Sequence, residues 1–294
     1  MEIDKAKILK AGKIASEVKT YARSIVKKGV PLLEIAEKIE SKIAELGGKP
    51  AFPVNLSINE IAAHYTPSHD DKTLAHGLIK ADFGVHIDGW VSDNSFSVDL
   101  DGNEENKKLI NAAEEALKNA LKIARNGIST DEIGTAIQET IESFGFSPVI
   151  NLSGHSMEKY ELHAGITIPN TNDKRNIKLK EGLYAIEPFA TRGSGKIRDG
   201  KPSGIYNLKD KRKPRSPIAR ETLAFIEKEY NTLPFCSRWI VKKLGSRALF
   251  SLNELESNGN LHQFHQLIEI SGRNVSQAEQ TILIEKDKVI VTTL

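Results

Sequence analysis

The sequence has little of what marks secreted, membrane-spanning or DNA-binding proteins. It contains one cysteine in 294 residues, Cys236, so no internal disulfide can form and a reducing compartment is expected. No run approaches about 18 apolar residues, and no apolar stretch follows Met1, so we expect neither a transmembrane helix nor a signal peptide. Lys and Arg number 41 against 39 Asp and Glu, which gives no strong global field for DNA. These absences predict a cytoplasmic protein without a membrane or DNA partner.

The chain instead contains two similar halves. Each half predicts two amphipathic helices followed by a short extended segment. Asn55-Leu56-Ser57 at the end of the first half recurs as Asn151-Leu152-Ser153 at the end of the second. We therefore predict an α+β fold with two α-α-β repeats, over 1–103 and over 104–206 plus 271–294. The predicted helices cover 4–28, 31–46, 105–126 and 129–144, and the extended segments 52–57 and 148–153.

A hairpin follows the first repeat. Asp88-Gly89 is a strong two-residue turn signal between apolar strands over 81–87 and 90–99. With that turn, Gly84 pairs with Asp93 and Asp82 opposes Ser95, so both acids lie on one face of the hairpin. Gly84 between them has no side chain and leaves space. Two converging carboxylates in apolar strands favour a divalent cation, although this hairpin alone is equally consistent with acids that face solvent.

Three further segments strengthen the metal interpretation. A histidine, His155, follows the apolar segment Asn151-Leu152, and Glu187 and Glu279 each lie within an apolar strand, over 182–191 and 276–285. A last strand is predicted over 288–293. Single acids of this kind are mostly rim residues, but three acid-bearing strands and a histidine in one chain indicate a shared site.

Residues 207–270 interrupt the second repeat and predict a helical insertion. Helical segments are expected around 218–230, 233–244 and 249–258. The insertion opens with a basic run over 209–215, which is interpreted as a solvated loop. Contact of this run with RNA or another polyanion, such as a transient association with the ribosome, remains open.

His64 lies in the segment Ala62–Pro67, and His163 opens His163-Ala164-Gly165. Together with the segments around Asp82, His155 and Glu187, these motifs resemble the type 2 methionine aminopeptidases, of the archaeal kind, over nearly the whole chain. The insertion before the last strands marks type 2. The resemblance implies a pita-bread fold, with two pseudo-symmetric halves around a curved antiparallel sheet, and a single catalytic domain over 1–294. It also implies a metallo-exopeptidase that removes the initiator methionine from nascent polypeptides with a small second residue. The motifs are Ala62-Ala63-His64-Tyr65-Thr66-Pro67, Asp82 to Gly89, Asn151 to His155, His163-Ala164-Gly165 and Ala185-Ile186-Glu187-Pro188-Phe189.

The resemblance also implies the metal ligands. Asp82 is expected to hold one ion, His155 and Glu187 the other, and Asp93 and Glu279 to bridge them. Four carboxylates and one imidazole suit Mn, Fe, Co or Zn, and the sequence does not choose among them. Glu187 is additionally expected to shuttle a proton.

Two histidines and three apolar residues complete the expected site. In the family, the residues that match His64 and His163 lie beside the scissile bond, where they contact the substrate and support the tetrahedral intermediate. Phe52, Leu162 and Phe264 map near the methionine pocket, although each could equally be ordinary core. Gly193-Ser194-Gly195-Lys196 has the wrong spacing for a phosphate-binding loop.

Some features depart from the family or leave alternatives. Ala278 and Gln280 flank Glu279 where relatives commonly have Phe and His, which puts the support of this ligand in doubt. A related Xaa-Pro aminopeptidase or prolidase, and a pita-bread binding protein without catalysis, are the alternative functions. A monomer is the default expectation.

Overall fold

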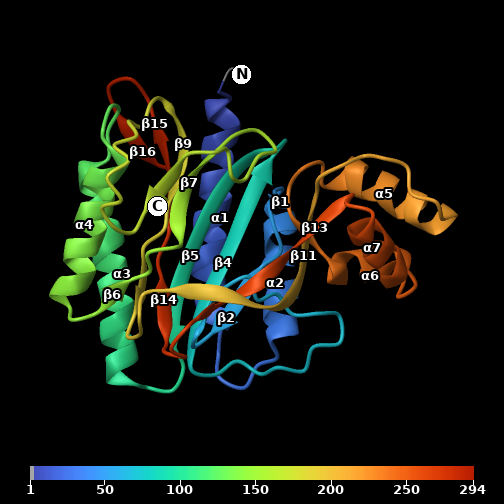
Figure 1. The fold of residues 1–294 in the computed structure, drawn as a ribbon, viewed down its shortest axis with the longest axis horizontal. Helices are drawn as coiled ribbons and strands as arrows, with labels where there is room; N and C mark the ends of the chain where they lie inside the picture. The colour runs from blue at the N-terminus through green and yellow to red at the C-terminus, as the bar shows by residue number, and fades with distance from the viewer. Residues whose placement is uncertain (1–2) are drawn as a thin grey trace.

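The computed structural model describes residues 3–294 and consists of antiparallel strands flanked by two helix pairs, with a smaller helical lobe on one side (Figure 1). Every strand pair recorded within these residues is antiparallel. No helix among them is long and apolar enough to cross a membrane.

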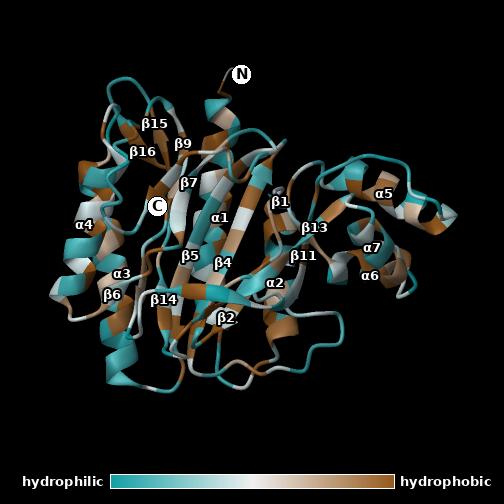
Figure 2. Cartoon of the chain, viewed as in Figure 1, coloured by the Kyte–Doolittle hydropathy of each residue, from teal (hydrophilic) through white to brown (hydrophobic). Residues whose placement is uncertain are grey.

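The four repeat helices form where the apolar periodicity predicts them: α1 (Lys5–Ile25), α2 (Leu32–Glu45), α3 (Glu104–Ile123) and α4 (Thr130–Ser143). Asp4 caps α1, and Ser129 with Glu132 forms the predicted capping box of α4. Figure 2 shows hydrophilic and hydrophobic residues on both α3 and α4, as expected for helices with one buried face. Each helix pair closes a separate apolar core.

The first half contains β1 (Lys49–Pro50), β2 (Asn55–Ile58), β3 (Ile61–Ala63), β4 (Leu78–Ile87) and β5 (Trp90–Asp99). The predicted hairpin register is confirmed: Gly84 pairs with Asp93, and Asp82 with Ser95. The space at Gly84 was predicted to lie between the two acids, but Phe52 occupies it. A Cβ on Gly84 would lie 2.5 Å from the Phe52 ring, so the missing side chain makes room for Phe52.

The second half contains more breaks than predicted. Its strands are β6 (Ser147–Pro148), β7 (Ser153–Met157), β8 (Thr167–Pro169), β9 (Gly182–Ile186), β10 (Phe189–Thr191), β14 (Val275–Gln277), β15 (Gln280–Ile284) and β16 (Val289–Val291). The predicted strand over 182–191 is interrupted at Glu187-Pro188, because proline has no N–H for the ladder. The strand over 276–285 is interrupted at Ala278-Glu279. The predicted extended segment over 148–153 is not one strand, because β6 ends at Pro148 and β7 begins at Ser153.

The insertion region contains three helices, α5 (Pro217–Glu229), α6 (Ser237–Leu244) and α7 (Ala248–Ser257), close to the predicted ranges. It is not helical throughout. Residues Leu261–Glu269 form β13, which pairs with the long β11 (Ile197–Leu208) and with β3, while β12 (Phe235–Cys236) pairs with β11. The insertion is thus joined to the first half by sheet hydrogen bonds as well as by packing; its bounds at 207 and 270 stay a prediction.

A buried ion pair also fastens the insertion to the first half. Arg238 on α6 is 2% exposed and contacts both carboxylate oxygens of Glu40 on α2, at 2.7 and 2.8 Å. Its Nε also donates to the carbonyl of Pro67 (3.0 Å), and the indole N–H of Trp239 donates to Glu40 (2.9 Å). The bidentate geometry and the additional hydrogen bonds satisfy both charges away from water.

We expect Arg238→Met to destabilise the protein by about 3–5 kcal/mol, because it leaves the Glu40 carboxylate buried without its counter-charge. Lys242→Met is the matched control, since Lys242 on the same helix forms an exposed ion pair with Glu37 and should contribute less than about 1 kcal/mol. Urea denaturation followed by circular dichroism measures both. Equal losses in the two variants would contradict the assigned role of Arg238.

Candidate metal centre and active site

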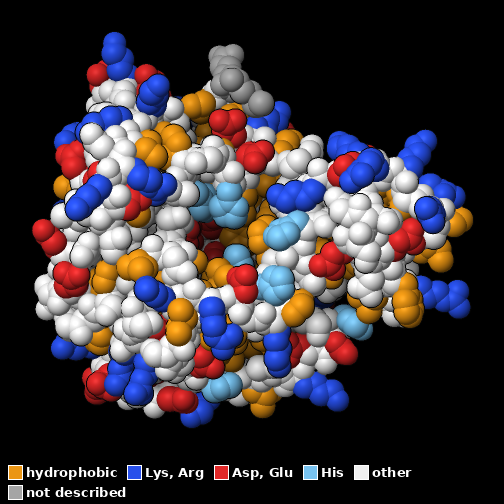
Figure 3. Space-filling model, viewed as in Figure 1, with side chains coloured by type: hydrophobic (Ala, Val, Ile, Leu, Met, Phe, Trp, Pro, Cys, Tyr) orange, Lys and Arg blue, Asp and Glu red, His pale blue; other side chains and the backbone are white. Residues whose placement is uncertain are grey.

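A cavity of about 330 Å³ opens between the two halves and the insertion. Figure 3 shows histidines gathered around a hollow on this face of the molecule. All ten residues predicted for the site line the cavity, although they lie far apart in the sequence. They are Phe52, His64, Asp82, Asp93, His155, Leu162, His163, Glu187, Phe264 and Glu279.

The predicted ligands reach the cavity from both halves. Asp82 and Asp93 lie on β4 and β5, and His155 lies within β7 rather than after a strand as predicted. Glu187 and Glu279 were predicted inside strands. They lie instead at the interruptions after β9 and before β15, and Glu279 forms an isolated bridge with Ser95 on β5. A strand break frees a side chain from the alternation of the sheet, so both glutamates can turn toward the same point.

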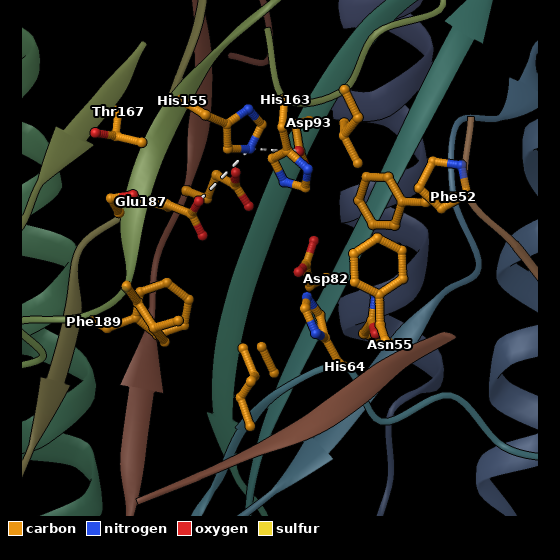
Figure 4. Close-up of a pocket in the computed structure, with 18 of the residues that line it drawn as sticks. Phe52, Asn55, His64, Asp82, Asp93, His155, His163, Thr167, Glu187 and Phe189 are labelled. Carbon is orange, nitrogen blue, oxygen red and sulfur yellow. Dashed lines mark ion pairs between the residues drawn. The ribbon is translucent and has the colours of Figure 1, made fainter. Parts of the chain in front are cut away.

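The acids and the imidazole converge closely. Nε2 of His155 is 3.6 Å from Asp93 and 3.7 Å from Glu187, and Figure 4 shows these three side chains pointing toward one another. Asp93, His155 and Glu279 are buried, and each offers a ligand atom within 4.8 Å of the others. This arrangement could hold a metal ion. Asp82 faces the same cavity from below the three side chains in Figure 4.

The electrostatics of the cluster favour a bound cation. Burial, together with repulsion by Asp93, raises the pKa values of Asp82, Glu187 and Glu279 well above their ordinary range, and burial raises the pKa of Asp93 to about 7. Burial also lowers the pKa of His155 to about 4, which keeps its imidazole neutral and able to bind a metal.

Unsatisfied oxygens support the same conclusion. Asp82 Oδ1, Asp93 Oδ1 and Glu279 Oε2 are buried and have no hydrogen-bond partner among the described residues. Buried carboxylate oxygens are costly unless they are paired or coordinate a cation. The residues present therefore fit a divalent metal.

Polar neighbours hold two ligands in place. The backbone N–H of Asp93 donates to the hydroxyl of Thr281 (2.7 Å), which in turn donates to the Asp93 carbonyl (2.7 Å). The side-chain amide of Gln277 donates to Oε2 of Glu187 at 3.4 Å. Sequence reasoning missed Gln277 and Thr281. The signal that could have found them is their place two residues on either side of Glu279.

The two expected substrate-contacting histidines lie on the rim of the cavity. His64 follows β3 and has a positive φ of 63°. Its Nδ1 is 3.1 Å from the carbonyl oxygen of His265, and its ring lies edge-to-face with that of Phe264, with the ring centroids 5.4 Å apart. The ring centroid of His163 is 4.4 Å from that of His155. Burial lowers the pKa values of both rim histidines, and the neighbouring His155 adds to this at His163. Both are therefore neutral at pH 7.

Oxygen and nitrogen ligands converging beside a partly apolar cavity are the arrangement of a metal-dependent hydrolase. The model of metallopeptidase family M24 matches residues 6–231. The methionine aminopeptidase of Pyrococcus abyssi (strain GE5 / Orsay) is 49% identical over 298 residues, which covers 100% of both chains. The chain belongs to metallopeptidase family M24, whose members use a divalent metal.

Solved structures support the fold. A thermophilic Arx1 superimposes with a TM-score of 0.83 at 16% identity, covering 99% of this chain and 91% of that one. The methionine aminopeptidase from Thermotoga maritima does so with a TM-score of 0.70 at 20% identity, covering 99% and 98%. The predicted α+β pita-bread fold is confirmed.

The raised pKa of Asp93 predicts how the metal-free protein responds to pH. Its pKa is about 7 in the folded chain against 3.8 ordinarily, so the folded state binds the proton more tightly than the unfolded state. The contribution of Asp93 to stability is therefore present below about pH 4 and is lost as the pH rises toward 7. In the presence of a chelator, Asp93→Asn should match the wild type in free energy of unfolding at pH 4 and exceed it at pH 8.

Urea denaturation at both pH values measures this difference, and titrating groups outside the cluster cancel because only the two proteins are compared. A difference that does not change between pH 4 and pH 8 would show that Asp93 is not buried in the metal-free chain. Saturating Mn²⁺ should reverse the order at pH 8, because only the carboxylate binds the ion.

Proposed function

We propose that this protein is a methionine aminopeptidase that removes the initiator methionine from nascent polypeptides with a small second residue. The observation that carries the proposal is the convergence of five ligand-type side chains on a cavity with an apolar side. The full-length relative from Pyrococcus abyssi, which bears that name, adds support.

Two divalent ions are proposed at the site. Asp82 would hold one ion, His155 and Glu187 the other, and Asp93 with Glu279 would bridge them. Mn, Fe, Co and Zn all suit this donor set. When bound, such ions supply a water of lowered pKa and polarise the scissile carbonyl.

The chain's own residues account for the remaining requirements. Glu187 has a strongly raised pKa and one oxygen held by Gln277, so its carboxylate is suited to accept a proton and return it to the leaving amine. Neutral His64 and His163 on the rim are suited to hydrogen-bond the scissile amide. Phe52, Leu162 and Phe264 form an apolar wall suited to a thioether side chain.

Nascent chains are the proposed partners, and we propose a cytoplasmic monomer. A transient contact with the ribosome through the basic run over 209–215 is proposed in addition, since this segment carries Lys209, Lys211, Arg212, Lys213 and Arg215.

Peptide cleavage after metal loading tests the activity. The metal-free protein should be inactive, and Mn²⁺, Fe²⁺, Co²⁺ or Zn²⁺ should restore release of methionine from Met-Ala-Ser. An Xaa-Pro peptide should remain intact. Cleavage of the Xaa-Pro peptide instead would favour a prolidase, and a chain that binds no divalent metal would favour a non-catalytic binding protein.

His64→Ala should lower kcat by about 10²–10³-fold while the bound metal stays unchanged, because His64 is proposed to stabilise the transition state and not to bind metal. Metal content by elemental analysis and steady-state kinetics on Met-Ala-Ser measure the two effects. His69→Ala, an exposed histidine outside the cavity lining, is the control and should behave as the wild type. A normal kcat for His64→Ala would remove this residue from the site.

A further inference from the structure

A lysine from the first helix reaches the metal-binding cluster from behind. Lys19 lies on α1, and the buried face of this helix packs against β4 and β5. The side chain is half-buried, and its Nζ donates to the backbone carbonyl of Glu279 at 3.3 Å. The contact joins residues 260 positions apart.

A close helix approach makes this contact feasible. Gly12 precedes Lys19 by seven residues, or about two turns, so both lie on the same face of α1. A Cβ on Gly12 would lie 2.1 Å from the carbonyl oxygen of Thr292, so only glycine allows α1 to sit this near the C-terminal segment. Thr292 in turn donates its N–H to Thr281 (2.9 Å), the residue that holds Asp93. These contacts fix one face of α1 relative to the proposed ligands Asp93 and Glu279.

The side chain of Glu279 has no recorded hydrogen bond among the described residues, and apart from Lys19 its main chain is held by the isolated bridge with Ser95. Its flanking residues are a buried alanine, Ala278, and Gln280, which has no recorded side-chain hydrogen bond among the described residues. The Lys19 amine is the side-chain group recorded in a hydrogen bond with the main chain of Glu279.

We propose that Lys19 is a positioning residue for the metal centre, which fixes the main chain of Glu279 and places a positive charge behind this ligand. The proposal rests on the metal site of the proposed function. In this proposal, Lys19 on α1 provides the polar contact with Glu279 that Ala278 and Gln280 do not provide. Removal of a hydrogen-bond partner of a metal ligand typically changes metal affinity by about 10–100-fold, and because Lys19 contacts the main chain of Glu279 and not its carboxylate, we expect the lower end of that range.

Calorimetric titration of the metal-free protein with Mn²⁺ at pH 7.5 tests this. Lys19→Met should weaken binding by about 10-fold, because the ligand loses its backbone anchor while the apolar stem is kept. Lys19→Arg, which keeps the charge and donor groups, should bind within about threefold of the wild type. Lys13→Met, an exposed lysine on the same helix, is the matched control and should bind as the wild type does.

Thermal unfolding with and without Mn²⁺ separates positioning from packing. A positioning role predicts that the metal raises the Tm of Lys19→Met by less than that of the wild type, whereas pure packing lowers both melting temperatures equally. If Lys19→Met does not fold, Lys19→Gln replaces it, since its side chain is uncharged and one atom too short to reach the carbonyl.

An unchanged Mn²⁺ affinity in the folded uncharged variant, or equal losses in Lys19→Met and Lys13→Met, would overturn the role of Lys19. Failure of the wild type itself to bind Mn²⁺ would overturn the proposed metal site instead, so the two failures are distinct.

Discussion

The structure depends on the repulsion among four carboxylates that antiparallel strands bring together out of water. Asp82, Asp93, Glu187 and Glu279 have pKa values raised by burial, and Asp93 repels the other three. Such a cluster is unfavourable in a bare protein and becomes favourable once cations share the oxygens. The strands that carry these four side chains hold them close together despite their mutual repulsion.

Both halves of the chain contribute to that frame. The first provides a rigid hairpin, β4 and β5, whose register puts two acids on one face. The second provides the neutral imidazole of His155 within β7 and two glutamates at strand breaks. Thr281 couples the two halves directly, because it hydrogen-bonds the backbone of Asp93 from β15. The ligands are therefore assembled by tertiary pairing and not by any local motif.

Some parts of the fold can be predicted from local sequence patterns alone. The helices, the capping box at Ser129 and the hairpin register follow from periodicity and turn chemistry, which act over a few residues. Pro188 is a local signal for the interruption at Glu187, because proline cannot continue a central strand, but the interruption at Glu279 has no such signal. An apolar run with one acid has the same pattern whether the strand is continuous or broken.

The polar support of the site was beyond sequence reasoning for a different reason. Gln277 and Lys19 are ordinary polar residues, and their roles depend on partners 90 and 260 positions away. Only the folded chain shows that the amide meets Glu187 and that the amine meets the carbonyl of Glu279. The proposed metal ligands come from resemblance to a family, and the structure brings all of them to one cavity.

The pairing of β13 with both β11 and β3 has a mechanical consequence. Phe264 on β13 and Ile205 on β11 line the cavity, and β3 ends next to His64, so part of the cavity lining belongs to one sheet that continues into the helical lobe. Because backbone hydrogen bonds join these strands, we expect the helical lobe and this part of the cavity lining to move together.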